Sequence, residues 1–153
     1  MAVLDLLDLP AATARFAPVI GLDLGTKTIG VAVSDASWMI ASPLDLIRKT
    51  KFTDDVKALF KLMDSRGAGA IIIGLPVNMD GTEGARCQSS RAFARNLLRI
   101  KDIPIAFWDE RLSSAAVNRF LIDEADTTRA RRAELVDKMA AAYILQGALD
   151  RLR

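Results

Sequence analysis

The chain has 153 residues, a formal net charge of +2, one cysteine and no histidine. This length suits one domain with a substantial core, while a single cysteine excludes an intramolecular disulfide and the lack of histidine excludes a Cys/His zinc site. Apolar runs fall short of the roughly 20 residues that a membrane helix needs, and the apolar start carries two acids and no basic residue, unlike a signal peptide. We therefore expect a cytoplasmic protein with no membrane segment.

The first predicted elements are three strands. Residues 19–24 and 29–34 are apolar and β-branched, and the glycines between them favour the tight turn of a β-hairpin. Residues 39–47 form a third extended segment that contains Pro43, which favours an edge position because proline cannot donate to a sheet ladder.

The rest of the chain alternates between helical and strand patterns. The predicted order is a helix from Thr53 closed by Gly67, a strand at 70–75, a loop at 76–84, a helix at 85–100, a strand at 103–108, a helix from about 113 to 123 and a helix from about 133 to 149. A hairpin followed by this alternation predicts an α/β fold, with a mixed five-stranded sheet and helices on both faces. Residues 1–17 are expected as an N-terminal lead-in, and residues 18–153 as a single domain.

Three carboxylates occupy unusual positions in this pattern. Asp23 lies in the first strand, Glu110 follows the last strand, and Asp137 lies among apolar and small residues of the last helix. The carboxyl ends of parallel strands meet at one edge of a sheet, and acids that converge there raise at least one pKa unless cations neutralise them. Such an oxygen cluster suits Mg²⁺ or Mn²⁺, and two such ions can support phosphodiester hydrolysis.

Each acid also has a purely structural interpretation. Asp23 can cap the turn by accepting bonds from backbone amides, and Glu110 can pair with Arg111 or cap the following helix. Asp137 can form a pair with Arg132 on the helix surface.

Basic side chains gather in two segments. The helix at 85–100 carries arginines at positions 91, 95 and 99 on one face, which either contacts phosphates or is simply solvated. Residues 126–132 place arginines near a helix start, against its dipole, and are interpreted either as a mobile basic loop that clamps phosphates or as an ordinary loop. The candidate substrate-binding residues are Lys27, Asn78, Arg86, Arg111, Arg129, Arg131 and Arg132.

Four ordered motifs resemble one protein family. They comprise residues 21–32, residues 73–76 with Asn78 and Asp80, residues 109–114, and residues 137–141 with 144–146. These motifs are similar to those of the YqgF (RuvX) family of Holliday junction resolvase-like nucleases, which is linked to maturation of the 5′ end of pre-16S ribosomal RNA.

The resemblance spans about residues 19–149 and implies a ribonuclease H-like fold. It also implies a cytoplasmic enzyme that hydrolyses phosphodiester bonds with Mg²⁺ or Mn²⁺ held by Asp23, Glu110 and Asp137. The fourth acid of other ribonuclease H relatives has no match, which leaves the number of ions open.

The leading functional hypothesis is thus a metal-dependent nuclease in pre-16S rRNA processing. Its expected partners are structured RNA, a ribosomal precursor particle or branched DNA, and it would act as a monomer or homodimer. Three alternatives remain: a Holliday junction resolvase, which needs two symmetric sites; a non-catalytic RNA-binding or ribosome-assembly factor; and an ATPase or sugar kinase of the actin and Hsp70 type. The last has a similar phosphate loop but closes two domains around its nucleotide.

Overall fold

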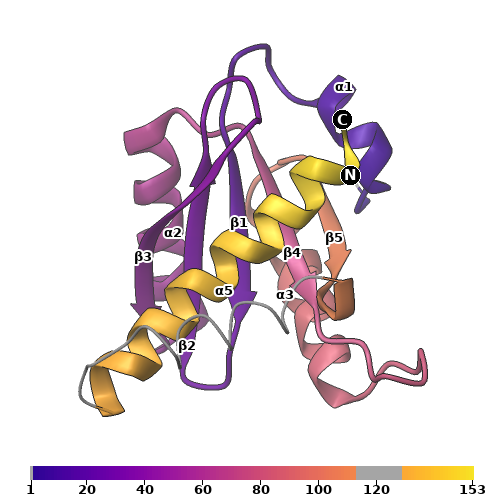
Figure 1. Cartoon of the computed structure of the whole chain (residues 1–153). Helices are drawn as coiled ribbons and strands as arrows, with labels where there is room; N and C mark the ends of the chain where they lie inside the picture. The colour runs from indigo at the N-terminus through magenta and orange to yellow at the C-terminus, as the bar shows by residue number, and fades with distance from the viewer. Residues whose placement is uncertain (1, 113–128) are drawn as a thin grey trace.

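A mixed five-stranded sheet forms the centre of the computed structural model, which describes residues 2–112 and 129–153 (Figure 1). The strands are β1 (Val19–Leu24), β2 (Thr28–Ser34), β3 (Ala41–Arg48), β4 (Ala70–Leu75) and β5 (Ile105–Asp109). Their order is β3-β2-β1-β4-β5; β1 pairs antiparallel with β2 and parallel with β4, and β4 pairs parallel with β5. The mixed sheet and the edge position of the third strand are confirmed.

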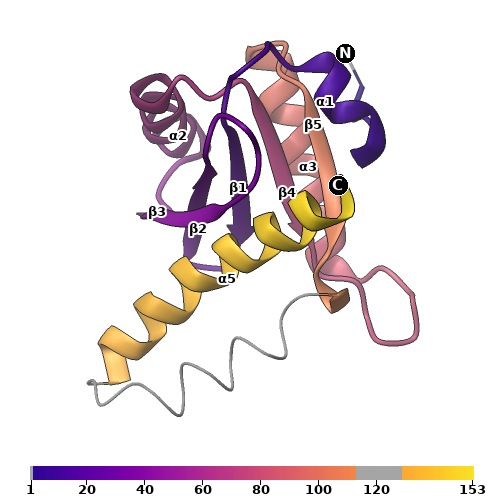
Figure 2. The same ribbon diagram turned by 45° about the horizontal axis from the view of Figure 1, so that its top comes forward.

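Helices cover both faces of this sheet. Figures 1 and 2 show α2 (Phe52–Arg66) and α3 (Ala85–Ile100) on one face, and α5 (Arg129–Arg151) running diagonally across the other. The short helices are η1 (Leu6–Asp8), α1 (Leu9–Ala12) and η2 (Glu110–Leu112). Within the described ranges, every helix is too short or too polar to cross a bilayer.

Side chains of β1 alternate between the two faces, as the period of a strand requires. Ile20 and Leu22 pack in the core beneath α2 and α3, whereas Val19 packs in a second core beneath α5. Gly21 lies on the α5 side, where an added Cβ would stand 2.7 Å from the Cβ of Leu145. The same alternation places Asp23 on the face that α5 covers.

The sequence predicted the bounds of α2 and α3 closely, and β3 contains an irregularity that the sequence did not predict. Helix α3 spans Ala85–Ile100 as predicted, and α2 ends at Gly67, whose φ of 65° is left-handed and suits glycine. In β3, Pro43 pairs with Ala32 next to an irregularity in register, which absorbs the missing amide of the proline.

The start of the last helix corrects one expectation. We expected a mobile basic loop at 126–132 and a helix from about 133, but α5 already begins at Arg129. The run from 129 to 135 consists of Arg, Ala, Glu and Leu, which are strong helix formers and outweigh the unfavourable dipole. The helix expected at about 113–123 lies outside the described residues, as do residues 126–128.

The N-terminal segment packs against the sheet. The Leu4 amide donates to the Ile105 carbonyl at 2.8 Å, and Leu4 forms a parallel bridge with Ala106 beside β5. Leu9 is wholly buried in the core beneath α5. The segment expected as a lead-in therefore contributes side chains to the core.

Candidate active site

Two of the three candidate acids meet at the carboxyl ends of parallel strands. Asp23 lies near the end of β1, Glu110 directly follows β5, and both are half-buried. Between them, Gly74 of β4 provides the necessary space, because a Cβ there would stand 2.6 Å from Oε1 of Glu110. The two carboxyl groups share a side-chain hydrogen bond.

This arrangement changes the acidity of Glu110. Burial, followed by the charge of Asp23 and its hydrogen bond, raises the pKa of Glu110 from the usual 4.5 to about 7, although the nearby charge of Arg86 lowers it. Glu110 therefore keeps its proton to a higher pH than an exposed glutamate does. A bound cation would stabilise the ionised form of both carboxylates.

The third acid, Asp137, belongs to α5. Positions 137, 141 and 145 share one face of a helix because they are four residues apart. Along this face, an added Cβ at Gly21 would approach Leu145 at its Cβ and Ala141 at its carbonyl oxygen. In the α5 backbone, position 137 therefore lies one turn before Ala141 on this face. The side chain of Asp137 lies outside the described part of the chain.

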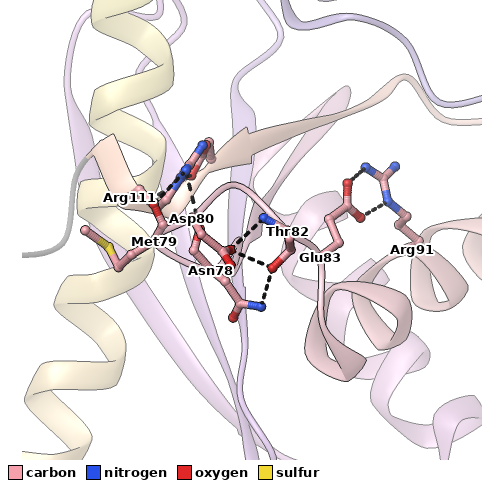
Figure 3. Close-up of polar contacts among 8 residues, drawn as sticks. Asn78, Met79, Asp80, Thr82, Glu83, Arg91 and Arg111 are labelled. Atoms are coloured by element: carbon pink, nitrogen blue, oxygen red, sulfur yellow. Dashed lines mark hydrogen bonds and ion pairs between the residues drawn. The ribbon is translucent and has the colours of Figure 1, made fainter.

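Arg111 forms an ion pair with a neighbouring acid, Asp109. Its guanidinium binds Asp109, with Nη2 at 2.6 Å from Oδ2, and holds the pKa of Asp109 below its usual range. Its Nη1 donates to the carbonyl oxygens of Asn78 at 3.3 Å and Met79 at 3.5 Å (Figure 3). Arg111 therefore ties the loop after β4 to the end of β5, next to Glu110.

Polar contacts also order the loop that contains Asn78. The side-chain amide of Asn78 donates to Oγ1 of Thr82 at 3.0 Å, and Oγ1 of Thr82 donates to Oδ1 of Asp80 at 2.6 Å. Farther along, Glu83 forms two hydrogen bonds with Arg91, at 2.7 and 2.8 Å (Figure 3). Arg91, on the basic face of α3, therefore holds this loop against the helix.

Two further basic candidates lie at the β1–β2 turn. Arg86 donates from Nη2 to the Leu24 carbonyl at 3.4 Å, and its charge acts on Glu110. Lys27 is exposed in the turn. The side chains of the remaining candidates, Arg129, Arg131 and Arg132, lie outside the described part, although their backbone belongs to α5.

Sequence reasoning missed two residues at this edge of the sheet. Gly74 interrupts an isoleucine-rich strand, and a glycine inside a strand often marks a close approach. Lys49 follows β3, and its Nζ donates to the Gly25 carbonyl at 3.1 Å. Its position had no signal in the sequence, because it depends on the pairing of β3 with β2.

The acid pair fits a divalent cation by the chemistry of its donors. Asp23 and Glu110 offer oxygen ligands only, and the charge of Asp23 that raises the pKa of Glu110 marks a place where positive charge is favoured. Among the described residues, no three acids, cysteines or histidines gather into one cluster. The side chain of Asp137, the third predicted ligand, lies outside the residues in which such a cluster could be sought.

Similar folds occur among solved structures. The chain resembles Thermus thermophilus RuvC in complex with a Holliday junction substrate, with a TM-score of 0.52, 12% identity, and coverage of 89% of this chain and 96% of that one. It also resembles the yeast mitochondrial Holliday junction resolvase Ydc2, with a TM-score of 0.50, 12% identity, and coverage of 96% and 85%. The fold is therefore ribonuclease H-like, as the sequence predicted.

Sequence comparison identifies the family. Proteins named "Putative pre-16S rRNA nuclease" from Phenylobacterium zucineum (strain HLK1) and Caulobacter vibrioides (strain NA1000 / CB15N) are 76% and 68% identical to this chain. Each alignment covers 100% of this chain and 99% of the relative. The model of a family described as "RuvX: Holliday junction resolvase" matches residues 17–151. The chain therefore belongs to the RuvX family.

Proposed function

We propose that this protein is a metal-dependent nuclease that hydrolyses phosphodiester bonds at the 5′ end of pre-16S ribosomal RNA. The observation that carries the proposal is the hydrogen-bonded pair of Asp23 and Glu110 at the carboxyl ends of parallel strands. Membership of the RuvX family supports nuclease chemistry, and the names of the full-length relatives support the RNA substrate.

Asp23, Glu110 and Asp137 would together hold Mg²⁺ or Mn²⁺. Such ions, when bound, activate water and stabilise the leaving oxygen during displacement at phosphorus. Asp23 and Glu110 would give up their shared proton on binding, and Gly74 keeps open the space that Glu110 occupies. The charge of Arg86 favours the ionised form of Glu110, the form that binds a cation.

The basic residues would bind the nucleic acid. The charge of Arg86 acts on Glu110 of the acid pair, and Lys27 is exposed in the adjacent turn. Arg111 and Asn78 would act through the ordered loop after β4. Arg129, Arg131 and Arg132 would add charge from the first two turns of α5. In this proposal the protein is cytoplasmic, acts as a monomer or homodimer, and meets its RNA free or in a ribosomal precursor particle.

The experiment compares two substrates in parallel, an rRNA precursor and a four-way DNA junction, each with Mg²⁺, Mn²⁺ or a chelator. We expect metal-dependent cleavage of the RNA, and a decrease of at least about 100-fold in Asp23→Asn and Asp137→Asn, because each change removes a charged ligand. Asp45→Asn is the matched control, since Asp45 is exposed on the edge strand β3.

Other outcomes would select an alternative function. The family description favours the DNA junction as a second candidate, and cleavage of the junction alone would assign that activity. RNA binding without cleavage, unchanged by Asp23→Asn, would indicate a non-catalytic factor. ATP binding in calorimetry without cleavage would indicate the nucleotide-binding alternative.

A further inference from the structure

We propose that a basic cavity beside the acid pair binds one backbone phosphate of the nucleic-acid strand, next to the bond that is cut. This inference rests on the proposed nuclease function and adds a specific recognition site to it. The cavity has a volume of about 120 Å³ and lies between the β1–β2 turn, Lys49 and the first three turns of α3.

The lining of the cavity suits an anion. Lys49 and Arg86 supply two positive charges, and Thr26 and Ser89 supply hydroxyl groups. The hydroxyl of Ser90 already donates to the Arg86 carbonyl at 3.1 Å, and Leu24 and Phe93 complete the lining with apolar surface. No carboxylate occurs among the described residues that line it. Two cations and two hydroxyl groups around one small space are the kinds of group that bind phosphate oxygens.

Both cations are held in place by the backbone of the turn. Nζ of Lys49 donates to the Gly25 carbonyl at 3.1 Å, and the Lys49 amide donates to the Lys27 carbonyl at 2.9 Å. Arg86 donates to the Leu24 carbonyl at 3.4 Å. An ammonium group has three donors, so the bond to Gly25 leaves two for a ligand. Because these groups are already positioned, a phosphate would cost little additional side-chain entropy to bind.

The turn itself requires glycine at its first position. The Gly25 amide donates to the Thr28 carbonyl at 2.9 Å, and a Cβ at Gly25 would stand 2.9 Å from that same oxygen. This close approach brings the Gly25 carbonyl within reach of Lys49. The geometry of the cavity therefore follows from the backbone of the hairpin.

The cavity and the acid pair lie on opposite sides of the end of β1. Leu24 lines the cavity, while the preceding residue, Asp23, points to the other face. Arg86 links the two, because it lines the cavity and its charge also acts on Glu110. A nucleic-acid strand that passes around the end of β1 can therefore place one phosphate at the acid pair and a neighbouring phosphate in the cavity.

The size of the cavity argues against a whole nucleotide. Pockets that enclose small-molecule ligands usually measure about 300–1,000 Å³, whereas this cavity measures about 120 Å³. A single water requires only about 10–15 Å³. The cavity therefore fits a group larger than water and much smaller than a nucleoside triphosphate, as a single phosphodiester is.

The first experiment measures RNA binding without cleavage. A fluorescein-labelled single-stranded RNA is titrated with the full chain in chelator, and anisotropy gives Kd at several KCl concentrations. We expect Lys49→Gln to weaken binding about 3–10-fold near 0.1 M salt and to reduce the salt slope by about 0.7, the value for one phosphate contact on a single strand. Lys49→Arg, which keeps the charge, should restore most of the affinity.

Lys61→Gln provides the matched control. Lys61 is exposed on α2 and lines a different hollow, beside Asp45. The substitution removes the same charge from the chain, so it should leave the salt slope unchanged. Equal effects of Lys49→Gln and Lys61→Gln, or an absence of RNA binding by the unmodified chain, would overturn the proposal. Thermal melts of each variant establish that it is folded.

The second experiment locates the phosphate. A set of RNAs, each with one neutral methylphosphonate linkage, is bound to the unmodified chain and to Lys49→Gln. We expect one linkage whose replacement weakens binding to the unmodified chain several-fold and weakens binding to Lys49→Gln clearly less, because Lys49 and that phosphate form one contact while Arg86 remains in the variant. The same loss in both proteins would contradict the assignment.

Failure of this inference can be told apart from failure of the nuclease function. Expected binding results without any metal-dependent cleavage would reject the nuclease and retain a phosphate site in the cavity. Cleavage of RNA together with equal effects of the Lys49 and Lys61 variants would retain the nuclease and reject the site.

Discussion

Glu110 has surroundings unlike those of an ordinary surface acid. It is half-buried, hydrogen-bonded to Asp23, and placed over a glycine that leaves room for it. A carboxyl group in such a position is stabilised in its protonated form. The pair therefore has a measurable effect on folding, independent of any substrate.

The first prediction concerns stability against pH. Native Glu110 has a pKa of about 7, above its value of roughly 4.3 in an unfolded chain. Its contribution to stability is therefore fully present below about pH 4 and is lost as the pH rises through about 7. In chelator, the Tm should fall between pH 5 and 8, and Glu110→Gln should flatten this dependence. Circular dichroism melts at each pH measure it.

A control variant separates this effect from general charge repulsion. Asp45→Asn removes an acid from the exposed edge strand, and it should keep the slope of the unmodified protein. Persistence of the full slope in Glu110→Gln would show that another group causes it.

The second prediction concerns Asp23. Asp23→Asn removes one charge from the pair, so in the presence of a chelator the Tm should rise by about 2–4 °C, the shift expected for roughly 1 kcal/mol in a chain of this size. Added Mg²⁺ should stabilise the unmodified protein by mass action but should have little effect on this variant. Differential scanning calorimetry with and without Mg²⁺ measures both. An equal response to Mg²⁺ in the two proteins would place the ion elsewhere.

At the scale of elements, two glycines of the sheet, Gly21 and Gly74, allow close contacts on the face that α5 covers. The atoms that they contact differ. A Cβ at Gly21 would meet the Cβ of Leu145 at 2.7 Å and the Ala141 carbonyl at 3.2 Å, which are fixed parts of a helix. A Cβ at Gly74 would meet the ends of two flexible side chains, Glu110 and Ile144, each at 2.6 Å. The same substitution should therefore have different effects at the two positions.

The third prediction compares these alanine variants. Gly21→Ala forces α5 away from β1 and should cost about 1–3 kcal/mol, as overpacking does, which is seen as a lower Tm. Gly74→Ala should change Tm by less, because Glu110 can rotate, but it should displace that carboxylate and reduce cleavage more than Gly21→Ala does. A larger loss of Tm in Gly74→Ala than in Gly21→Ala would contradict this account.

The elements that the sequence predicted well are those with a strong local pattern. The strands around Asp23 and Gly74 have continuous apolar runs, and Gly67 ends α2 as a left-handed cap. The rule that ligands gather at the carboxyl ends of parallel strands predicted that Asp23 and Glu110 would meet. No local pattern could predict Lys49, because its contact with the turn depends on which strands are paired.

The predicted start of α5 was wrong because two local effects compete there. The dipole disfavours arginines at a helix start, but helix propensity summed over several residues is larger. The role of Asp137 stays a prediction for a related reason. It depends on how α5 is rotated about its axis, and that rotation follows from packing of the whole helix on the sheet.

At the scale of the whole molecule, two cores stabilise the two faces of one sheet, and the N-terminal segment belongs to one of them. Leu9 is 0% exposed and packs with residues of β1, β4 and α5, whereas Leu7 is 59% exposed. Residues before the first strand should therefore affect the stability of the domain.

The fourth prediction tests this contribution. Leu9→Ala should destabilise the protein by about 2–5 kcal/mol, the usual cost of truncating a buried leucine, whereas Leu7→Ala should cost less than about 0.5 kcal/mol. Urea denaturation of both variants measures the difference. Similar values for the two would show that the segment is only a lead-in, as expected from the sequence.

The diagonal position of α5 has a consequence for biosynthesis. All five strands and both helices of the opposite face precede α5 in the chain, so they emerge from the ribosome first. Until α5 follows, Val19, Ile72 and Ala106 lie on an uncovered apolar surface, and a nascent chain in that state exposes surface that favours aggregation. Translation must therefore pass Leu149 before the folding of this face can be completed.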